Sequence, residues 1–120
     1  EHLSKLLDCQ IIAPDLRAHG DTFTTDDDNL CIESQTSDVM QILHKIFENK
    51  IPKIFVIGHS MGGAVAVHVA KELGKLSAIL GITVIDVVEG SALEALSSMH
   101  NFLRTRPQHF KSTEHAIEWW

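Results

Sequence analysis

Apolar and polar positions follow two different periods along this chain. Short apolar runs with the length and composition of buried strands occur at residues 10–13, 53–57 and 78–85. Two longer stretches, residues 36–49 and 61–73, repeat their apolar side chains at helical spacing. Ser or Thr lies ahead of the first stretch and Gly74 follows the second, as is typical of helix ends. The alternation of strands and helices predicts an α/β fold with a parallel sheet.

The composition is that of a globular protein and excludes several kinds of partner. Of the 120 residues, 44% are hydrophobic and 22% are charged. The net charge is -6 and the ten Lys and Arg are thinly spread, so we expect neither nucleic acid nor an anionic membrane as partner. No apolar run approaches the roughly 18 residues of a membrane span. The two cysteines, Cys9 and Cys31, lack metal-site spacing, and we expect them to be reduced thiols in the core.

The pentapeptide Gly58-His59-Ser60-Met61-Gly62 has the G-x-S-x-G pattern, directly after the second apolar run and before the second helical stretch. This placement is typical of a nucleophile elbow, a strained strand-to-helix turn that presents a serine hydroxyl. Small residues two positions before and after the serine let the backbones approach closely. We therefore predict that Ser60 is the nucleophile of a serine hydrolase and that the Met61 N–H is one oxyanion donor. His59 is a candidate to line the site or to pack beside it.

A serine nucleophile needs a general base and an acid that orients the base. Asp86 is the candidate acid, because it ends the third strand and the order Ser, Asp, His is that of α/β hydrolases, although an Asp there is also suited to capping. Other histidines are weak candidates: His19 lies on a loop at the same sheet edge, and we expect His68 to pack in the core. The histidines after Asp86 all lie in predicted helical segments, namely His100, His109 and His115. We expect the catalytic base outside this chain.

The last quarter of the chain carries helical patterns and no strand pattern. Residues 91–103 favour a helix, Arg106-Pro107 interrupts it, and another helix is expected near Ser112. Earlier, residues 21–29 are polar and read as a solvated loop. We expect one partial domain, residues 1–120, with the sheet and its helices in residues 1–90 and the start of a helical cap in residues 91–120.

The length conflicts with the motif, because a complete α/β-hydrolase sheet needs about twice as many residues. The chain starts at Glu1 without a methionine and stops at Trp120, inside a predicted helix. No glycine-rich oxyanion loop precedes Gln10. We therefore expect a partial α/β-hydrolase fold whose N- and C-terminal parts are missing.

Several stretches together resemble one family of hydrolases, the protein phosphatase methylesterases. Residues 15–20 and 58–64 are shared widely among hydrolases and discriminate poorly. The discriminating stretches come later in the chain: residues 85–92 (IDVVEGSA), 99–104 (MHNFLR), 106–107 (RP) and 116–119 (AIEW). The resemblance covers nearly the whole chain.

The resemblance implies an activity and a partner. Ser60 would be the nucleophile, Asp86 the acid and the Met61 N–H an oxyanion donor, with the histidine in a part that this chain lacks. The substrate would be the methyl ester on the C-terminal leucine of the protein phosphatase 2A catalytic subunit, which would also be the protein partner. Neither a metal nor an organic cofactor would be required. The place of action would be intracellular, cytoplasmic or nuclear or both.

The resemblance also implies that one strand of the family's sheet is missing here, between residues 13 and 53. We therefore expect the 120 residues alone to be unstable and inactive. Two other functions stay open: a different α/β-hydrolase esterase or thioesterase, because the elbow indicates acyl transfer and not the acyl group, and a truncated, non-catalytic module that binds the phosphatase.

Overall fold

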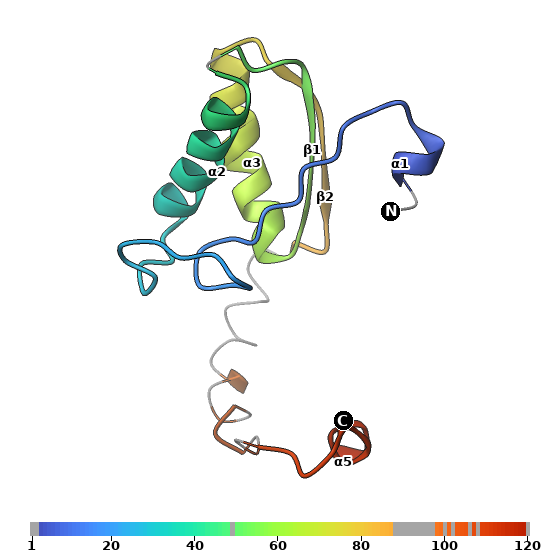
Figure 1. Ribbon diagram of the computed structural model, residues 1–120. Helices are drawn as coiled ribbons and strands as arrows, with labels where there is room; N and C mark the ends of the chain where they lie inside the picture. Colours follow the sequence, from blue (N-terminus) through green and yellow to red (C-terminus); the bar gives the residue numbers. More distant parts are fainter. Residues whose placement is uncertain are drawn as a thin grey trace. The chain divides into compact units, whose positions relative to one another are not determined.

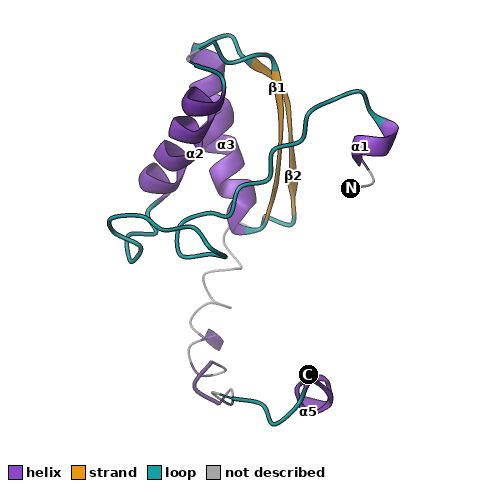
Figure 2. Ribbon diagram, in the orientation of Figure 1, coloured by secondary structure: helices purple, strands orange, loops and turns teal. Residues whose placement is uncertain are grey.

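The computed structural model describes residues 3–48, 50–87, 98, 99, 101, 103–105, 107 and 109–119. The chain divides into two compact units, Glu1–Val87 and Val88–Trp120. The first unit contains α1 (Leu3–Leu6), α2 (Ile32–Ile46), β1 (Ile54–His59), α3 (Met61–Lys75) and β2 (Ile79–Ile85) (Figure 2). The second contains α5 (Thr113–Trp119).

Strands β1 and β2 form a parallel two-stranded sheet, with α3 as the connection between them. The register runs from Ile54 opposite Ile79 to His59 opposite Ile85, with one irregularity after Ile54. The strands predicted at residues 53–57 and 78–85 and the helix between them are confirmed, each within two residues of the expected bounds. Because the strands are parallel and in register, their carboxyl ends meet at one edge of the sheet.

Helices α2 and α3 lie on the same side of this sheet, with α3 against both strands and α2 against α3 (Figure 1). The core lies between these layers and consists of Leu43, Val65, Val69, Leu73 and Ala78. Leu73 is the largest side chain that is fully buried among the described residues. This packing fixes the N-terminus of α3 at the carboxyl edge of the sheet.

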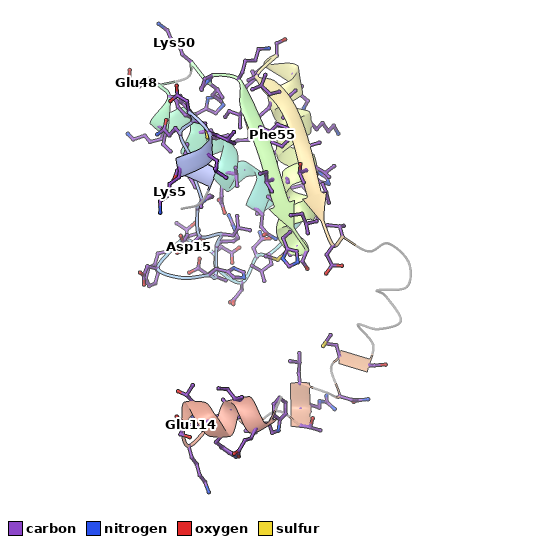
Figure 3. The ribbon with its side chains drawn as sticks, turned by 90° about the vertical axis from the view of Figure 1, so that its right-hand side faces the viewer. Lys5, Asp15, Glu48, Lys50, Phe55 and Glu114 are labelled. Carbon is purple, nitrogen blue, oxygen red and sulfur yellow. The ribbon has the colours of Figure 1, made fainter. Side chains whose placement is uncertain are left out.

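The opposite face of the sheet is uncovered in the described part of the chain. Figure 3 looks onto this face, where Phe55 projects from β1. The side chains of Phe55 and Ile57 are 54% and 55% exposed, respectively. Phe55 lies over Gly81 of β2, where a Cβ would be 2.7 Å from the ring. An apolar sheet face therefore faces solvent in this structure.

The first predicted strand, residues 10–13, is wrong. These residues pair with no strand of the described part, and the partly buried side chain of Ile12 packs against the core. A strand exists only when a neighbouring strand satisfies its backbone groups, and no described segment pairs with this one. The observed sheet therefore has two strands instead of three.

Two helix ends also differ from the expectation. Helix α2 begins at Ile32, and its N-cap is Cys31, whose Sγ accepts a hydrogen bond from the Ser34 N–H, instead of the expected Ser or Thr. Helix α3 continues through Gly74 to Lys75, and the chain turns away only at Ser77, which has φ 52°. Gly74 therefore does not end the helix.

Three side chains that were expected in the core are exposed. Cys9 and Cys31 are both free thiols at the surface, and His68 lies on an exposed position of α3. Cys31 is exposed because it caps a helix end, which places it at the rim of the helical layer.

The second unit is described in part. The described residues within the expected helix at residues 91–103 are helical, and the remaining residues of that segment lie outside the described ones. Helix α5 confirms the helix expected near Ser112, and Phe110 makes edge-to-face contacts with His115 and Trp119, with ring centroids 5.8 Å apart in both pairs. Assignment of this region to a cap stays a prediction. Among the described helices, none is both long and apolar enough to span a bilayer.

Candidate active site

Ser60 occupies the turn between β1 and α3 in a conformation that few non-glycine residues adopt. Its φ is 51° and its ψ is -123°. Because β1 ends at His59 and α3 begins at Met61, the whole change of direction falls on this residue. Such a conformation costs about 1–3 kcal/mol and is concentrated at functional sites. The backbone therefore has the strained geometry that the pentapeptide predicts.

Hydrogen bonds hold this turn to both neighbouring elements. The Ser60 N–H donates to the Ile85 carbonyl oxygen of β2 over 2.9 Å. The Ser60 carbonyl oxygen accepts from the Gly63 N–H over 2.9 Å and from the Ala64 N–H over 3.3 Å. The serine backbone is thus fixed by the sheet on one side and by the first turn of α3 on the other.

Close backbone approach explains some glycines of this turn but not all. A Cβ on Gly58 would collide with the Gly62 carbonyl oxygen and lie 2.7 Å from the Ala66 Cβ. A Cβ on Gly63 would collide with the Val87 side chain and lie 3.1 Å from a Val84 methyl group. Nothing in the described part of the chain lies within 4 Å of a Cβ placed on Gly62. The prediction that the turn needs a glycine is therefore confirmed at Gly58 and wrong at Gly62. Gly63 is also crowded, and the motif did not indicate it.

Asp86 lies beside the elbow because of the strand register. Ile85 pairs with His59, and Asp86 follows directly with φ 51° as the chain leaves β2. Its carboxylate Oδ2 is 3.9 Å from the His59 Nε2. Both side chains are largely exposed, 73% for Asp86 and 66% for His59. The structure therefore brings Ser60, His59 and Asp86 to one end of the two strands.

Met61 is the first residue of α3, so its N–H has no acceptor within the helix. The N-terminus of a helix carries a partial positive charge from the aligned peptide dipoles. An oxyanion next to Ser60 would be stabilised by this N–H and by that charge. The position suits the role expected of Met61, which stays a prediction.

Among the described histidines of the first unit, only His59 has an ion pair with a residue of this site. The His19 Nδ1 lies 2.9 Å from the Arg17 carbonyl oxygen, and no hydrogen bond or ion pair joins His19 to Ser60 in the described part. His109 and His115 belong to the second unit, and His100 lies outside the described residues. The expectation that the base lies outside the chain stays a prediction. The described residues contain no group of three His, Cys, Asp or Glu side chains that could hold a metal ion.

Arg17 fixes the polar loop at residues 21–29, a role that sequence reasoning missed. Its Nε and Nη2 donate to the two carboxylate oxygens of Asp38 on α2, over 2.6 and 2.8 Å. Its Nη1 donates to the carbonyl oxygens of Asp26 and Asn29. The hydrogen bonds to Asp38 raise the pKa of the Arg17 guanidinium above its ordinary value. The only sequence signal was an arginine ahead of an acidic loop, and its partner on α2 is a tertiary contact.

Comparison with known proteins extends this picture. The alpha/beta hydrolase family matches residues 1–119. The chain belongs to this family. The strained serine turn, the parallel strands and the flanking helices therefore form part of an α/β-hydrolase fold, as the sequence predicts.

Relatives within the family confirm the resemblance to methylesterases. The chain is 49% identical over 111 residues to protein phosphatase methylesterase 1 of Bos taurus and of Homo sapiens. It is 44% identical over 119 residues to a probable protein phosphatase methylesterase 1 of Caenorhabditis elegans. The matches cover 92%, 92% and 99% of this chain and 29%, 28% and 33% of those proteins, respectively. The chain thus spans a third or less of the length of these relatives.

Proposed function

We propose that the complete protein containing this chain is a serine carboxylesterase of the protein methylesterase type. Its substrate is the C-terminal leucine methyl ester of the protein phosphatase 2A catalytic subunit, and that subunit is its protein partner. No metal or organic cofactor takes part in this reaction. It acts inside the cell, in the cytoplasm, the nucleus or both. The 120 residues alone are inactive in this proposal.

One observation carries the proposal: Ser60 has φ 51° at a strand-to-helix turn, within a chain 49% identical to named methylesterases. The strained turn supports serine chemistry, because φ 51° with ψ -123° lies outside the left-handed helical region that ordinary turns use. The identity to methylesterases favours a methyl ester as substrate. Asp86 beside the turn supports the presence of a catalytic acid.

In the proposed reaction the Ser60 Oγ attacks the ester carbonyl carbon while a base outside this chain takes the hydroxyl proton. The Asp86 carboxylate orients that base and stabilises its cation. The oxyanion is held by the Met61 N–H and by a second donor outside the chain. Collapse of the intermediate expels methanol, which takes the proton from the base, and leaves an acyl ester on Ser60. Water then hydrolyses this ester and frees the leucine carboxylate.

The complete protein should be treated with a fluorophosphonate probe and analysed by mass spectrometry, with Ser60→Ala as the control. We expect the probe on Ser60 alone. The protein should also release methanol from a peptide that ends in a leucine methyl ester, and Ser60→Ala should lower kcat by roughly 10³-fold or more.

Other outcomes would select the alternatives. Hydrolysis of simple lipid esters without hydrolysis of the peptide would indicate a different esterase. The binding-module alternative would be selected by two results together. The wild-type protein would neither react with the probe nor hydrolyse the ester, and its Ser60→Ala variant would still bind the phosphatase subunit in a pull-down.

A further inference from the structure

We propose that His59 is a positioning residue for Asp86: it holds one carboxylate oxygen of the acid and leaves the other for the catalytic base. This inference rests on the proposed function, because it takes Asp86 as the acid. It gives the variable residue of the pentapeptide a role in orienting the acid.

The juxtaposition of the two side chains follows from the sheet. Parallel pairing places His59 opposite Ile85, so the next residue on β2, Asp86, leaves the strand beside the imidazole. The His59 Nε2 then lies 3.9 Å from Oδ2 of the carboxylate. This separation is longer than a hydrogen bond, and we expect it to shorten to one when the substrate binds, as catalytic contacts in free enzymes often do.

Asp86 is the only described residue that an ion pair joins to His59. The elements packed against β1 are β2 and α3. β2 itself has no titratable side chain, and Asp86 follows its last residue. α3 has none before His68, in the middle of the helix, and its other charged residues, Lys71, Glu72 and Lys75, follow toward its far end. The positive N-terminus of α3 is the other fixed charge near this edge.

A carboxylate can serve two donors at once, because each oxygen accepts separately. The contact of His59 with Oδ2 leaves Oδ1 for the N–H of the base. Asp86 is then held in the orientation that the base requires. Since both side chains are largely exposed, water screens the effect and it should be small.

The test uses the complete protein with His59→Ala, which removes the side chain, and His59→Gln, which keeps an N–H donor and cannot titrate. His68→Gln is the matched control, because His68 is an exposed histidine of α3 outside the site. Three quantities are measured: kcat and KM on the methyl ester peptide from pH 5 to 9, the rate of fluorophosphonate labelling at Ser60, and the melting temperature.

We expect His59→Ala to lower kcat about three- to tenfold with KM within about twofold of wild type. His59→Gln should recover most of kcat, because its side-chain N–H can still donate to the Asp86 carboxylate. His68→Gln should match wild type.

A wild-type kcat and pH profile in both His59 variants would overturn the inference, as would a rise in KM alone, which would indicate contact with the substrate. A kcat loss that follows a lower melting temperature, with no recovery of kcat in His59→Gln, would also overturn it. A wild-type protein that neither reacts with the probe nor hydrolyses the methyl ester would overturn the proposed function and this inference together. An active wild-type protein with unaffected His59 variants would overturn this inference alone.

Discussion

Ser60 combines two demands at the scale of a single residue: it carries the hydroxyl that the chemistry needs, and it occupies a φ of 51° that side chains with a Cβ resist. A glycine would adopt the turn at lower cost and would have no nucleophile. The same conflict is found at strained active-site residues generally. The pentapeptide predicts this residue from sequence because its glycines and its place between a strand and a helix are local features.

The conflict gives a prediction for stability in the complete protein. Ser60→Gly should have a free energy of unfolding about 1 kcal/mol higher than Ser60→Ala, because glycine relieves the positive φ whereas alanine keeps a Cβ there. Both variants lose the nucleophile and should not react with the fluorophosphonate probe. Urea unfolding of the two variants measures the difference. Equal stabilities, or a less stable glycine variant, would contradict the strain at Ser60.

At the scale of elements, β1, α3 and β2 form the unit that makes the site. The strand ends set the positions of Ser60, His59 and Asp86, and the packing of α3 on the sheet sets how closely its first turn approaches β1. The distance between the first turn of α3 and β1 decides which glycine is required, and the sequence motif does not. Gly58 meets the backbone of Gly62, whereas Gly62 faces open space in the described part.

Two alanine substitutions separate these positions. Gly58→Ala should lower the free energy of unfolding of the complete protein by about 2 kcal/mol, because its Cβ would overlap the Gly62 backbone. Gly62→Ala should leave the free energy unchanged or raise it by up to about 1 kcal/mol, because alanine favours the helix and its Cβ meets no atom of the described residues. Urea unfolding followed by circular dichroism measures both. If Gly62→Ala lowered the free energy of unfolding and Gly58→Ala did not, Gly62 and not Gly58 would be the position that requires glycine.

At the scale of the whole molecule, the described part leaves much of its apolar surface in water. Large hydrophobic side chains on both strands are exposed, including Leu80 at 65% and Phe55 at 54%. The core beneath α2 and α3 is small, with Leu73 as its largest fully buried side chain. A core of this size gives little hydrophobic stabilisation against the conformational entropy of the chain.

We therefore predict that the isolated 120 residues do not unfold cooperatively and have no esterase activity. Thermal melting followed by near-ultraviolet circular dichroism should show no sigmoidal transition, and methanol release should equal that of the Ser60→Ala version. The complete protein serves as the control and should melt cooperatively. A sharp melt or measurable turnover from the isolated segment would overturn this prediction.

The sequence alone determined the local features of this protein. The strand–turn–helix unit and its serine could be predicted, because their signals lie in consecutive residues. These signals are the apolar periods of β1, α3 and β2 and the pentapeptide at Ser60. The ends of α2 and α3 were less predictable, because Cys31 and Ser77 took roles that serine and glycine usually have.

Tertiary structure decided everything that depends on a distant partner. Residues 10–13 have the composition of a strand, yet no described strand supplies the hydrogen bonds that would make them one. The Arg17–Asp38 pair, the contact of His59 with Asp86 and the crowding at Gly58 and Gly63 join residues brought together by packing. A sequence states which groups are available, and only the folded backbone sets the distances on which hydrogen bonds, charge and steric contact depend.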